Sequence, residues 1–422
     1  MRRVIRVARN VTFLAFLFSL APVKAQQPAA VTVFEGARLL TGEGGAPIAD
    51  AAFIVESGRF TAVGRKGQLK VPPGAARVDL TGKTVMPAIV DAHKHLAVTR
   101  DALVDQLRQF AYYGVGVAMS MGQDTGDVAF QVRAETIPGA ARSRTAGRGL
   151  TGPEPGRTEA PYWIKTEAEA RKAVQELAER RVDLVKIWVD DRDKTVNKLS
   201  PELYRAAIDE AHKHNLRVIA HIFTLEDAKG VLRAGLDLFA HGVRDQDIDD
   251  EFIKMMKARP NMIVDPNLPD RGVRVDRSWL RESVPAGEFE RLQAASKDDP
   301  KAQQFFGIQA RNLAKLNAAG IKIALGTDGP IPWAAHEEMV DMVASGMTPA
   351  QVIVAATRNA ADMLKVADAG TIAPKKSADF VVLDANPLDD ITNTRRISSV
   401  YLRGSQVDRA ALKARWMGGA SR

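Results

Sequence analysis

Two histidines one residue apart, His93 and His95, lie at the end of a long apolar run. Residues i and i+2 of a β-strand point to the same side, so both imidazoles can face one metal ion. A second pair, His212 and His214, has the same spacing but follows a helix-start pattern, Ser-Pro at 200–201. Residues i and i+2 of a helix diverge by about 200°. We therefore expect a metal site at the first pair and a solvated helix end at the second.

Four further residues of metal-binding type lie near the ends of short apolar runs: Lys186, His221, His241 and Asp328. These runs alternate with stretches that begin in Thr-x-x-Glu or related patterns, which are typical of capped helix starts. Alternating strands and helices predict a parallel sheet. We predict an α/β fold with a (β/α)8 TIM barrel, which needs about 250 residues. The predicted strands are 84–93, 114–121, 142–148, 182–189, 217–223, 237–241, 262–267 and 321–327.

All six candidate ligands fall at the carboxyl ends of predicted strands, which carry the chemistry in such barrels. The strand with the weakest pattern is 142–148, because it is more polar than a buried strand should be. At each position another interpretation remains. Lys186 could sit at the barrel mouth with its amine in water, and Asp328 could cap the helix after strand eight. His221 or His241 could be a hydrogen-bonded core histidine, and a site with one metal remains possible.

These elements resemble the amidohydrolase superfamily of metal-dependent hydrolases. The resemblance rests on the Met-Pro…Asp-Ala-His-Lys-His segment at 86–95, the strand-four lysine, the two single histidines, Gly-Thr-Asp at 326–328 and a late segment at 370–383. Within the superfamily the chain is most similar to imidazolonepropionase-like amidohydrolases, bacterial Xaa-Pro dipeptidases and ochratoxin-degrading hydrolases. The resemblance implies two divalent ions, with zinc expected. It assigns His93, His95 and Asp328 to the first ion, His221 and His241 to the second, and Lys186, carboxylated by carbon dioxide, to a bridge between them.

The chemistry of the residues agrees with this implied site. A lysine inside an apolar strand is costly when it is charged and unpaired, whereas two divalent cations would stabilise a carbamate. A metal lowers the pKa of its bound water to about 7, which gives a hydroxide nucleophile at neutral pH. Asp328 can take the proton and deliver it to the leaving amine, so it is the predicted catalytic residue.

Residues 1–25 have the pattern of a signal peptide: early arginines, an apolar run at 11–20 and a Val-Lys-Ala cleavage site at 23–25. The leader holds five basic residues and no acidic one, so cleavage lowers the net charge from +8 to +3 (8 − 5). The high pI therefore gives no support for a nucleic-acid partner. We expect a periplasmic or extracellular enzyme without stable membrane insertion after cleavage. The absence of cysteine excludes disulfides and thiolate ligands.

The predicted domains follow from these patterns and from the 45% hydrophobic content, which allows a large barrel core. The barrel covers 84–365. The β-rich segments 26–83 and 366–410 predict one small β-sandwich domain built from both termini. Residues 411–422 are expected to form a tail, and the charged stretch 270–304 a long polar loop after strand seven.

We predict an exported amidohydrolase that cleaves a C–N bond of a small N-acyl or aminoacyl amino acid, dipeptide-like, such as an Xaa-Pro or ochratoxin-like compound. Arg144, Arg148 and Arg271 could pair with the substrate carboxylate, and His336 could line the pocket. Each of the four could instead be an ordinary loop or helix-start residue. Hydrolysis of an aryl amide, carbamate, urea or cyclic amide is the alternative, and a silent envelope binding protein is a remote one. We also expect a homo-oligomer.

Overall fold

The computed structural model describes residues 31–418 of the chain. The predicted signal peptide at 1–25 lies outside the described residues. Among the helices that the structure describes, none is both long and apolar enough to cross a membrane.

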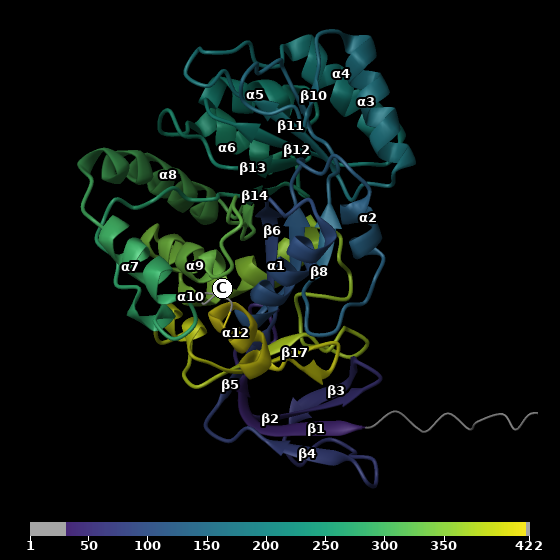
Figure 1. The fold of residues 1–422 in the computed structure, drawn as a ribbon, viewed down its shortest axis with the longest axis vertical. Coiled ribbons are helices and arrows are strands. Elements are labelled where there is room, and N and C mark those ends of the chain that lie inside the picture. Colours follow the sequence, from purple (N-terminus) through teal and green to yellow (C-terminus); the bar gives the residue numbers. More distant parts are fainter. Residues whose placement is uncertain (1–30, 419–422) are drawn as a thin grey trace, which may run out of the picture.

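Two parallel sheets form the centre of the molecule (Figure 1). The first contains β6 (Ile89–Lys94), β7 (Val115–Ser120) and β8 (Arg142–Thr145) in chain order. The second runs in the order β10 (Tyr162–Trp163), β9 (Leu150–Thr151), β11 (Val185–Val189), β12 (Val218–Ile222), β13 (Leu238–Ala240), β14 (Ile263–Asp265) and β15 (Lys322–Ile323). Backbone hydrogen bonds join both edges of the first sheet, β6 and β8, to the second sheet. Ala92 N donates to Leu325 O at 2.9 Å, and Asp183 N donates to Thr145 O at 3.0 Å.

Each of the eight predicted strands has a counterpart among these, with shorter bounds. The first prediction, one strand over 84–93, is wrong in one respect: the run divides at Ala88. Its first half, β5 (Thr84–Pro87), pairs with strands from the chain termini, and only β6 joins the parallel sheet. Strand β8 is polar because Arg142 and Arg144 form ion pairs on its outer side, while Ser143 and Thr145 are buried.

Helices follow the parallel strands along the chain. They are α1 (Arg100–Tyr112), α2 (Val128–Arg133), α3 (Glu167–Glu179), α4 (Pro201–Lys213), α5 (Leu225–Arg233), α6 (Asp250–Lys257), α8 (Pro300–Ala318), α9 (Ala334–Ala344), α10 (Pro349–Val354) and α11 (Ala360–Met363). The predicted start patterns are confirmed: Thr166 and Thr348 form capping boxes, and the Thr224 side chain accepts from Asp227 N. These caps satisfy amide groups that a helix start would otherwise leave unpaired.

Two segments predicted to be irregular are helical. The stretch 270–304 contains a short 3-10 turn (Ser278–Leu280), α7 (Ala286–Ala295) and the start of α8, where Asp299 caps a helix with proline in its first turn. Most of the predicted tail is α12 (Arg409–Gly418). The Trp416 ring packs on Tyr112 of α1, with ring centroids 5.1 Å apart, and its indole N–H donates to Ser283 O at 3.0 Å. These helices were not recognised in the sequence because their few buried apolar residues lie among many exposed charged ones.

Strands from both ends of the chain form one further sheet, at the bottom of Figure 1. Its order is β18 (Ser405–Gln406), β17 (Ile397–Leu402), β16 (Phe380–Leu383), β5, β1 (Thr32–Leu39), β2 (Ile48–Glu56) and β3 (Arg59–Arg65), while β4 (Ala76–Asp79) also pairs with β1. Its core is aromatic: Phe34 stacks on Phe53 and Phe380 stacks on Tyr401, with centroids 5.0 and 4.6 Å apart. Phe380 also packs edge-on against Phe34 and Phe53, with centroids 5.1 Å apart in both pairs, so aromatic contacts join the two ends of the sequence.

Candidate metal centre

The predicted histidines meet Asp328 at the carboxyl ends of the parallel strands. The Asp328 carboxylate lies 2.9 Å from His95 Nε2, 3.2 Å from His93 Nε2 and 3.6 Å from His241 Nε2. One ligand atom each from His93, His241 and Asp328 fall within 4.8 Å of one another. Burial acts to raise the pKa of Asp328, but His93 and His95 outweigh it and hold that pKa well below its ordinary value. The cluster therefore combines imidazole nitrogens with an ionised carboxylate.

The backbone is strained where these side chains leave their strands. His241, Asn267 and Asp328 have φ of 82°, 42° and 46°, which is the left-handed region. Such a conformation costs a non-glycine residue about 1–3 kcal/mol. Hydrogen bonds hold it in place: His241 N donates to Asp265 O at 2.6 Å, and Asp328 N donates to His93 O at 2.9 Å. Backbone strain at three neighbouring strand ends therefore directs their side chains toward the cluster.

Glycine at position 326 is required by close packing. A Cβ there would lie 2.3 Å from Oδ2 of the fully buried Asp265. The segment after β15 therefore passes directly over the Asp265 carboxylate, which lies 3.5 Å from His93 Nδ1. Burial raises the pKa of Asp265 above its ordinary value, although the nearby His93 opposes this shift. Asp265 is thus a second carboxyl group behind the cluster.

Lys186, on β11, is completely buried, and its amine has no hydrogen-bond partner. The interpretation in which this amine reaches water is therefore wrong. The amine lies 5.2 Å from the centre of the Trp188 ring. Burial lowers the pKa of Lys186 to about 7, although Asp328 and Asp265 act in the opposite direction. An unpartnered amine in this buried position lowers the stability of the protein unless another group pairs with it or modifies it.

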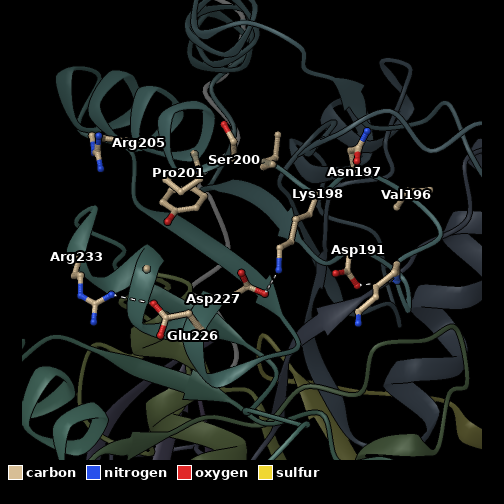
Figure 2. A pocket seen from close by; sticks show the side chains of 14 residues that line it. Asp191, Val196, Asn197, Lys198, Ser200, Pro201, Arg205, Glu226, Asp227 and Arg233 are labelled. Carbon is tan, nitrogen blue, oxygen red and sulfur yellow. Dashed lines mark hydrogen bonds and ion pairs between the residues drawn. The ribbon is translucent and has the colours of Figure 1, made fainter.

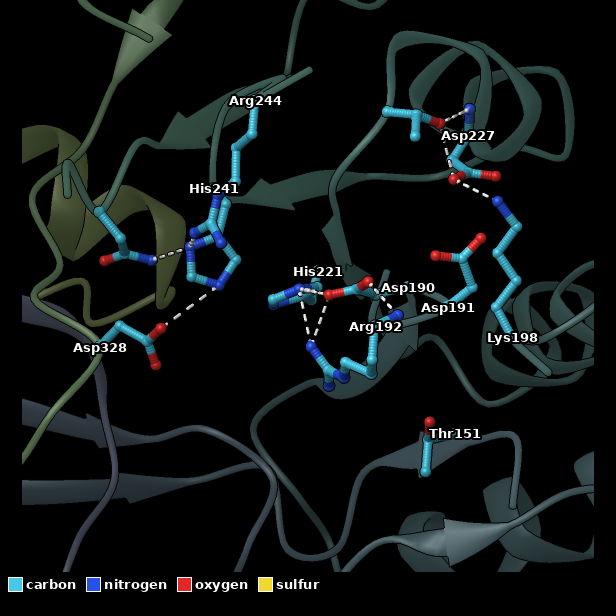
Figure 3. A network of polar contacts seen from close by, with 12 residues as sticks. Thr151, Asp190, Asp191, Arg192, Lys198, His221, Asp227, His241, Arg244 and Asp328 are labelled. Atoms are coloured by element: carbon cyan, nitrogen blue, oxygen red, sulfur yellow. Dashed lines mark hydrogen bonds and ion pairs between the residues drawn. The ribbon is translucent and has the colours of Figure 1, made fainter. Parts of the chain in front are cut away.

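His221, on β12, packs against His241 with ring centroids 4.4 Å apart, and its Nε2 lies 2.9 Å from Oδ2 of Asp190 (Figure 3). Burial lowers the pKa of His221 to about 3, so the ring is neutral. When Nε2–H donates to Asp190, the lone pair of Nδ1 is left for a ligand. Asp190 therefore fixes the tautomer of His221. Arg192 pairs with the same Asp190 oxygen at 2.5 Å.

Asn267 connects two of the clustered histidines. Its Nδ2 lies 2.8 Å from His93 Nδ1 and 3.2 Å from His241 Nδ1, while its Oδ1 is buried without a partner. Rotation of the amide by 180° exchanges these two atoms and lets Oδ1 accept from both Nδ1–H groups. Both Nε2 atoms, which face Asp328, are then free to bind a metal. The side chains present therefore fit divalent ions, with imidazole and carboxylate donors that suit zinc.

The comparisons with known proteins agree with this geometry. The family model described as "Amidohydrolase family" matches residues 84–407. The chain belongs to the amidohydrolase family. Ochratoxinase of Aspergillus niger is 26% identical, over 87% of this chain and 84% of that protein. Imidazolonepropionase of Deinococcus radiodurans is also 26% identical, over 85% of this chain and 92% of that protein. A solved structure of a Bifidobacterium longum protein assigned as a prolidase matches with a TM-score of 0.76 and 26% identity, over 93% of this chain and 100% of that chain.

This amidohydrolase is a hydrolase that acts on carbon–nitrogen bonds. It shares its α/β fold with solved amidohydrolase structures.

The interpretation of Asp328 as a helix cap is wrong, because α9 begins at Ala334 with Trp333 at the N-cap. The helical placement of the second His-Lys-His is confirmed: His212 pairs with Asp237 at 2.9 Å on the surface of the molecule.

Three of the four predicted substrate-binding residues have other partners, away from the cluster. Arg144 pairs at 3.3 Å with Asp183, which precedes β11 and so lies at the opposite strand end. The Arg148 guanidinium stacks over Tyr162 and donates to the carbonyl groups of 159–161. His336 is buried, with its ring nitrogens 3.0 Å from Thr394 Oγ1 and 2.9 Å from Tyr113 O. The sequence placed these residues near strand ends but did not reveal which way they point.

The fourth residue, Arg271, lines a cavity of about 190 Å³ together with Thr327, the neighbour of Asp328. Its guanidinium is paired with Asp341 at 2.7 Å. A larger cavity, of about 680 Å³, lies between α4 and α5 (Figure 2), and none of the six candidate ligands lines it. Its charges are largely matched within it, as in the pairs Lys198–Asp227 at 2.7 Å and Arg233–Glu226 at 3.2 Å.

Lys94, between the two histidines, points away from them, as the strand period predicted. It is completely buried, 3.2 Å from Asp91 Oδ2, and its amine donates to Ile331 O at 2.9 Å. Asp91 also accepts from Thr327 Oγ1 at 2.9 Å. This pair ties the end of β6 to the loop that carries Asp328.

The sequence analysis missed the polar residues that surround the ligands: Asp190, Arg192, Arg244, Asp265 and Asn267. Each lies at or within four residues of the end of a strand that carries or neighbours a ligand. Their position at strand ends was the one signal in the sequence that could have identified them, because active-site residues of such barrels lie at these ends.

Proposed function

We propose that this chain is an exported, binuclear metal-dependent amidohydrolase that cleaves the amide bond of a small N-acyl or aminoacyl amino acid. The observation that carries the proposal is the convergence of three histidines on Asp328 beside the bare, buried amine of Lys186. The relatedness to ochratoxinase and imidazolonepropionase supports a small-molecule amide as the substrate.

In this proposal the two parallel sheets act as one (β/α)8 barrel, closed by the backbone hydrogen bonds at both of their edges. The barrel covers 84–365, and the segments 26–83 and 366–410 form the satellite β-domain. The leader at 1–25 directs export, so the enzyme works in the periplasm or outside the cell.

The first ion would be held by His93, His95 and Asp328, and the second by His221, through Nδ1, and His241. Bound divalent ions supply Lewis acidity, which polarises the scissile carbonyl and lowers the pKa of water. Asp190 and Asn267 hold the ligand imidazoles in the tautomers that this binding needs.

Lys186 would bridge the two ions as a carbamate. With a pKa of about 7, a large share of its amine is uncharged at neutral pH, and the uncharged form reacts with carbon dioxide. The amine nitrogen bonds to the carbon of carbon dioxide and releases one proton to solvent. The product is an anion in a place where the charged amine has no hydrogen-bond partner.

Asp328 is the proposed proton carrier. Its carboxylate is ionised in the resting site because the neighbouring histidines lower its pKa against the effect of burial. It can therefore accept a proton from the attacking water. An amide nitrogen leaves poorly unless it is protonated, so the same carboxyl group then delivers the proton to the leaving amine.

A panel of N-acyl amino acids and Xaa-Pro dipeptides, assayed with and without added zinc, tests this proposal. We expect zinc-dependent release of a free amino acid, and loss of turnover after chelation. Zinc-independent turnover, or no turnover of any member, would contradict it.

The carbamate has its own test. Lys186→Ala should lose most activity, and short carboxylic acids in the medium should restore part of it by occupying the vacated bridge. His241→Ala, which lacks an imidazole instead, should not respond to the same acids. Equal responses of the two variants would argue against a carboxylated lysine.

A further inference from the structure

Arg244 follows His241 by three residues and has no carboxylate partner. Its guanidinium lies against His241 Nδ1, its Nε is buried without a hydrogen bond, and no ion pair joins it to a carboxylate of the described residues (Figure 3). Arg192, on the neighbouring side of the site, differs: it pairs with Asp190 at 2.5 Å and with Glu154 at 3.4 Å. Like the Lys186 amine, the Arg244 guanidinium is therefore a cation at this site without a paired carboxylate.

An unpaired, largely buried guanidinium is costly, because arginine cannot shed its charge. Burial lowers the pKa of Arg244, which means that its surroundings disfavour the cation. The carboxylates of Asp328 and Asp190 reduce this cost from a distance without pairing with the guanidinium, and the positive charge of Arg192 adds to it. An anion from the ligand would offset it, and the planar fork of a guanidinium matches a carboxylate.

Arg244 also adjoins an apolar surface. Its backbone N–H donates to Phe223 O at 2.9 Å, and Phe223 follows the ligand His221 by two residues. The Phe223 ring stacks on Phe305 of α8, with centroids 6.3 Å apart and planes 23° apart. Both rings are only partly buried, so they offer an aromatic surface on the same side of the site as Arg244.

We propose that Arg244 binds the free carboxylate of the substrate and that Phe223 and Phe305 contact the side chain beside it. This inference rests on the proposed function and narrows it: the substrate is an N-acyl derivative of an apolar, preferably aromatic, amino acid. Arg244, rather than Arg144, Arg148 or Arg271, is the carboxylate receptor, because those three already have partners.

Two substrates that differ only in the carboxylate test this inference. N-acetyl-L-phenylalanine carries it, and N-acetylphenethylamine lacks it. In the zinc-loaded parent, we expect kcat/KM to favour the acid by on the order of 100-fold. Equal values for the two compounds would overturn the inference without any variant. N-acetylglycine should be a poorer substrate than the phenylalanine derivative, and parity between them would overturn the part assigned to Phe223 and Phe305.

Variants then locate the receptor. Arg244→Met should lose most of the preference for the acid, measured as the ratio of the kcat/KM values of the two compounds within the same variant, and Arg244→Lys should keep part of it. Arg233→Gln, on the exposed face of α5, is the matched control and should keep the parent preference. Calorimetric binding of L-phenylalanine, the product, should weaken in Arg244→Met, a readout that does not depend on turnover. If Arg244→Met keeps the full preference, the inference fails and the proposed function stands. If the parent cleaves neither amide and does not bind the product, the inference fails, and turnover of the panel of N-acyl amino acids and Xaa-Pro dipeptides then decides the proposed function.

Discussion

Replacing Lys186 by methionine should stabilise the metal-free protein. The amine is fully buried without a partner, and its pKa falls from 10.5 to about 7. At 1.36 kcal/mol for each pKa unit, the buried charge costs about 5 kcal/mol. Methionine has a similar length and no charge, so it should fill the same space. Loss of the cation–π contact with Trp188 reduces this gain in stability by about 1 kcal/mol. The expected gain is on the order of 4 kcal/mol.

The sign of its pH dependence follows from linkage. Below pH 7 the lysine is protonated in both folded and unfolded chains, and the folded state bears the full cost. Between pH 7 and 10.5 the folded chain loses the proton first, so parent stability rises with pH. The advantage of Lys186→Met should therefore be full at pH 6, about half near pH 8.5 and absent above pH 10.5.

Urea unfolding of the two proteins, in chelator and in buffers free of carbon dioxide, measures this difference. Both conditions matter, because a carbamate or a bound ion would remove the free-energy cost of the unpaired buried charge. A Lys186→Met protein that is less stable than the parent, or a difference that does not change with pH, would refute the view of Lys186 as an unpaired buried cation. The same substitution should abolish turnover, so stability and activity should change in opposite directions.

Three further predictions concern other parts of the site. Asp328→Asn should keep its fold and much of its metal but lose about 10²- to 10⁴-fold in kcat, with a smaller change in KM, and near-parent steady-state rates would assign the proton to another group. His93→Ala should lose metal and activity, whereas His212→Ala on the helix surface should match the parent, and equal metal loss in both would contradict the strand argument. Lys94→Met should lower the free energy of unfolding by about 3–5 kcal/mol, because Asp91 would remain buried without its cation; calorimetry showing no loss would mean that this pair does not stabilise the fold.

The sequence predicted which side chains come together at this site because strand geometry constrains their positions. A short apolar run fixes where a parallel strand ends, and the period of two fixes which residues share a side. That was enough to bring His93, His95, His241 and Asp328 together and to exclude His212. The same period of two places Lys94 on the opposite side of the strand from His93 and His95.

The supporting residues could not be predicted in the same way. Asp190 contacts His221 from a different strand, and Arg244 turns back to His241 from a loop whose path depends on tertiary contacts. For Arg144, the pattern predicted a place on a strand but not the partner, Asp183, that holds the guanidinium at the opposite end. Helix α12 was missed because its anchor, Trp416, contacts residues distant in the sequence. Tertiary packing, rather than the local sequence pattern, decides which partner each of these side chains contacts.

Elemental analysis of the purified protein tests the binuclear site directly. We predict close to two divalent ions per chain after growth with zinc and bicarbonate. The ions and the carbamate would complete a site that otherwise has unpartnered polar atoms, with the proposed ligands His93, His95, Lys186, His221, His241 and Asp328. A reproducible content of one ion per chain, or none, would contradict it.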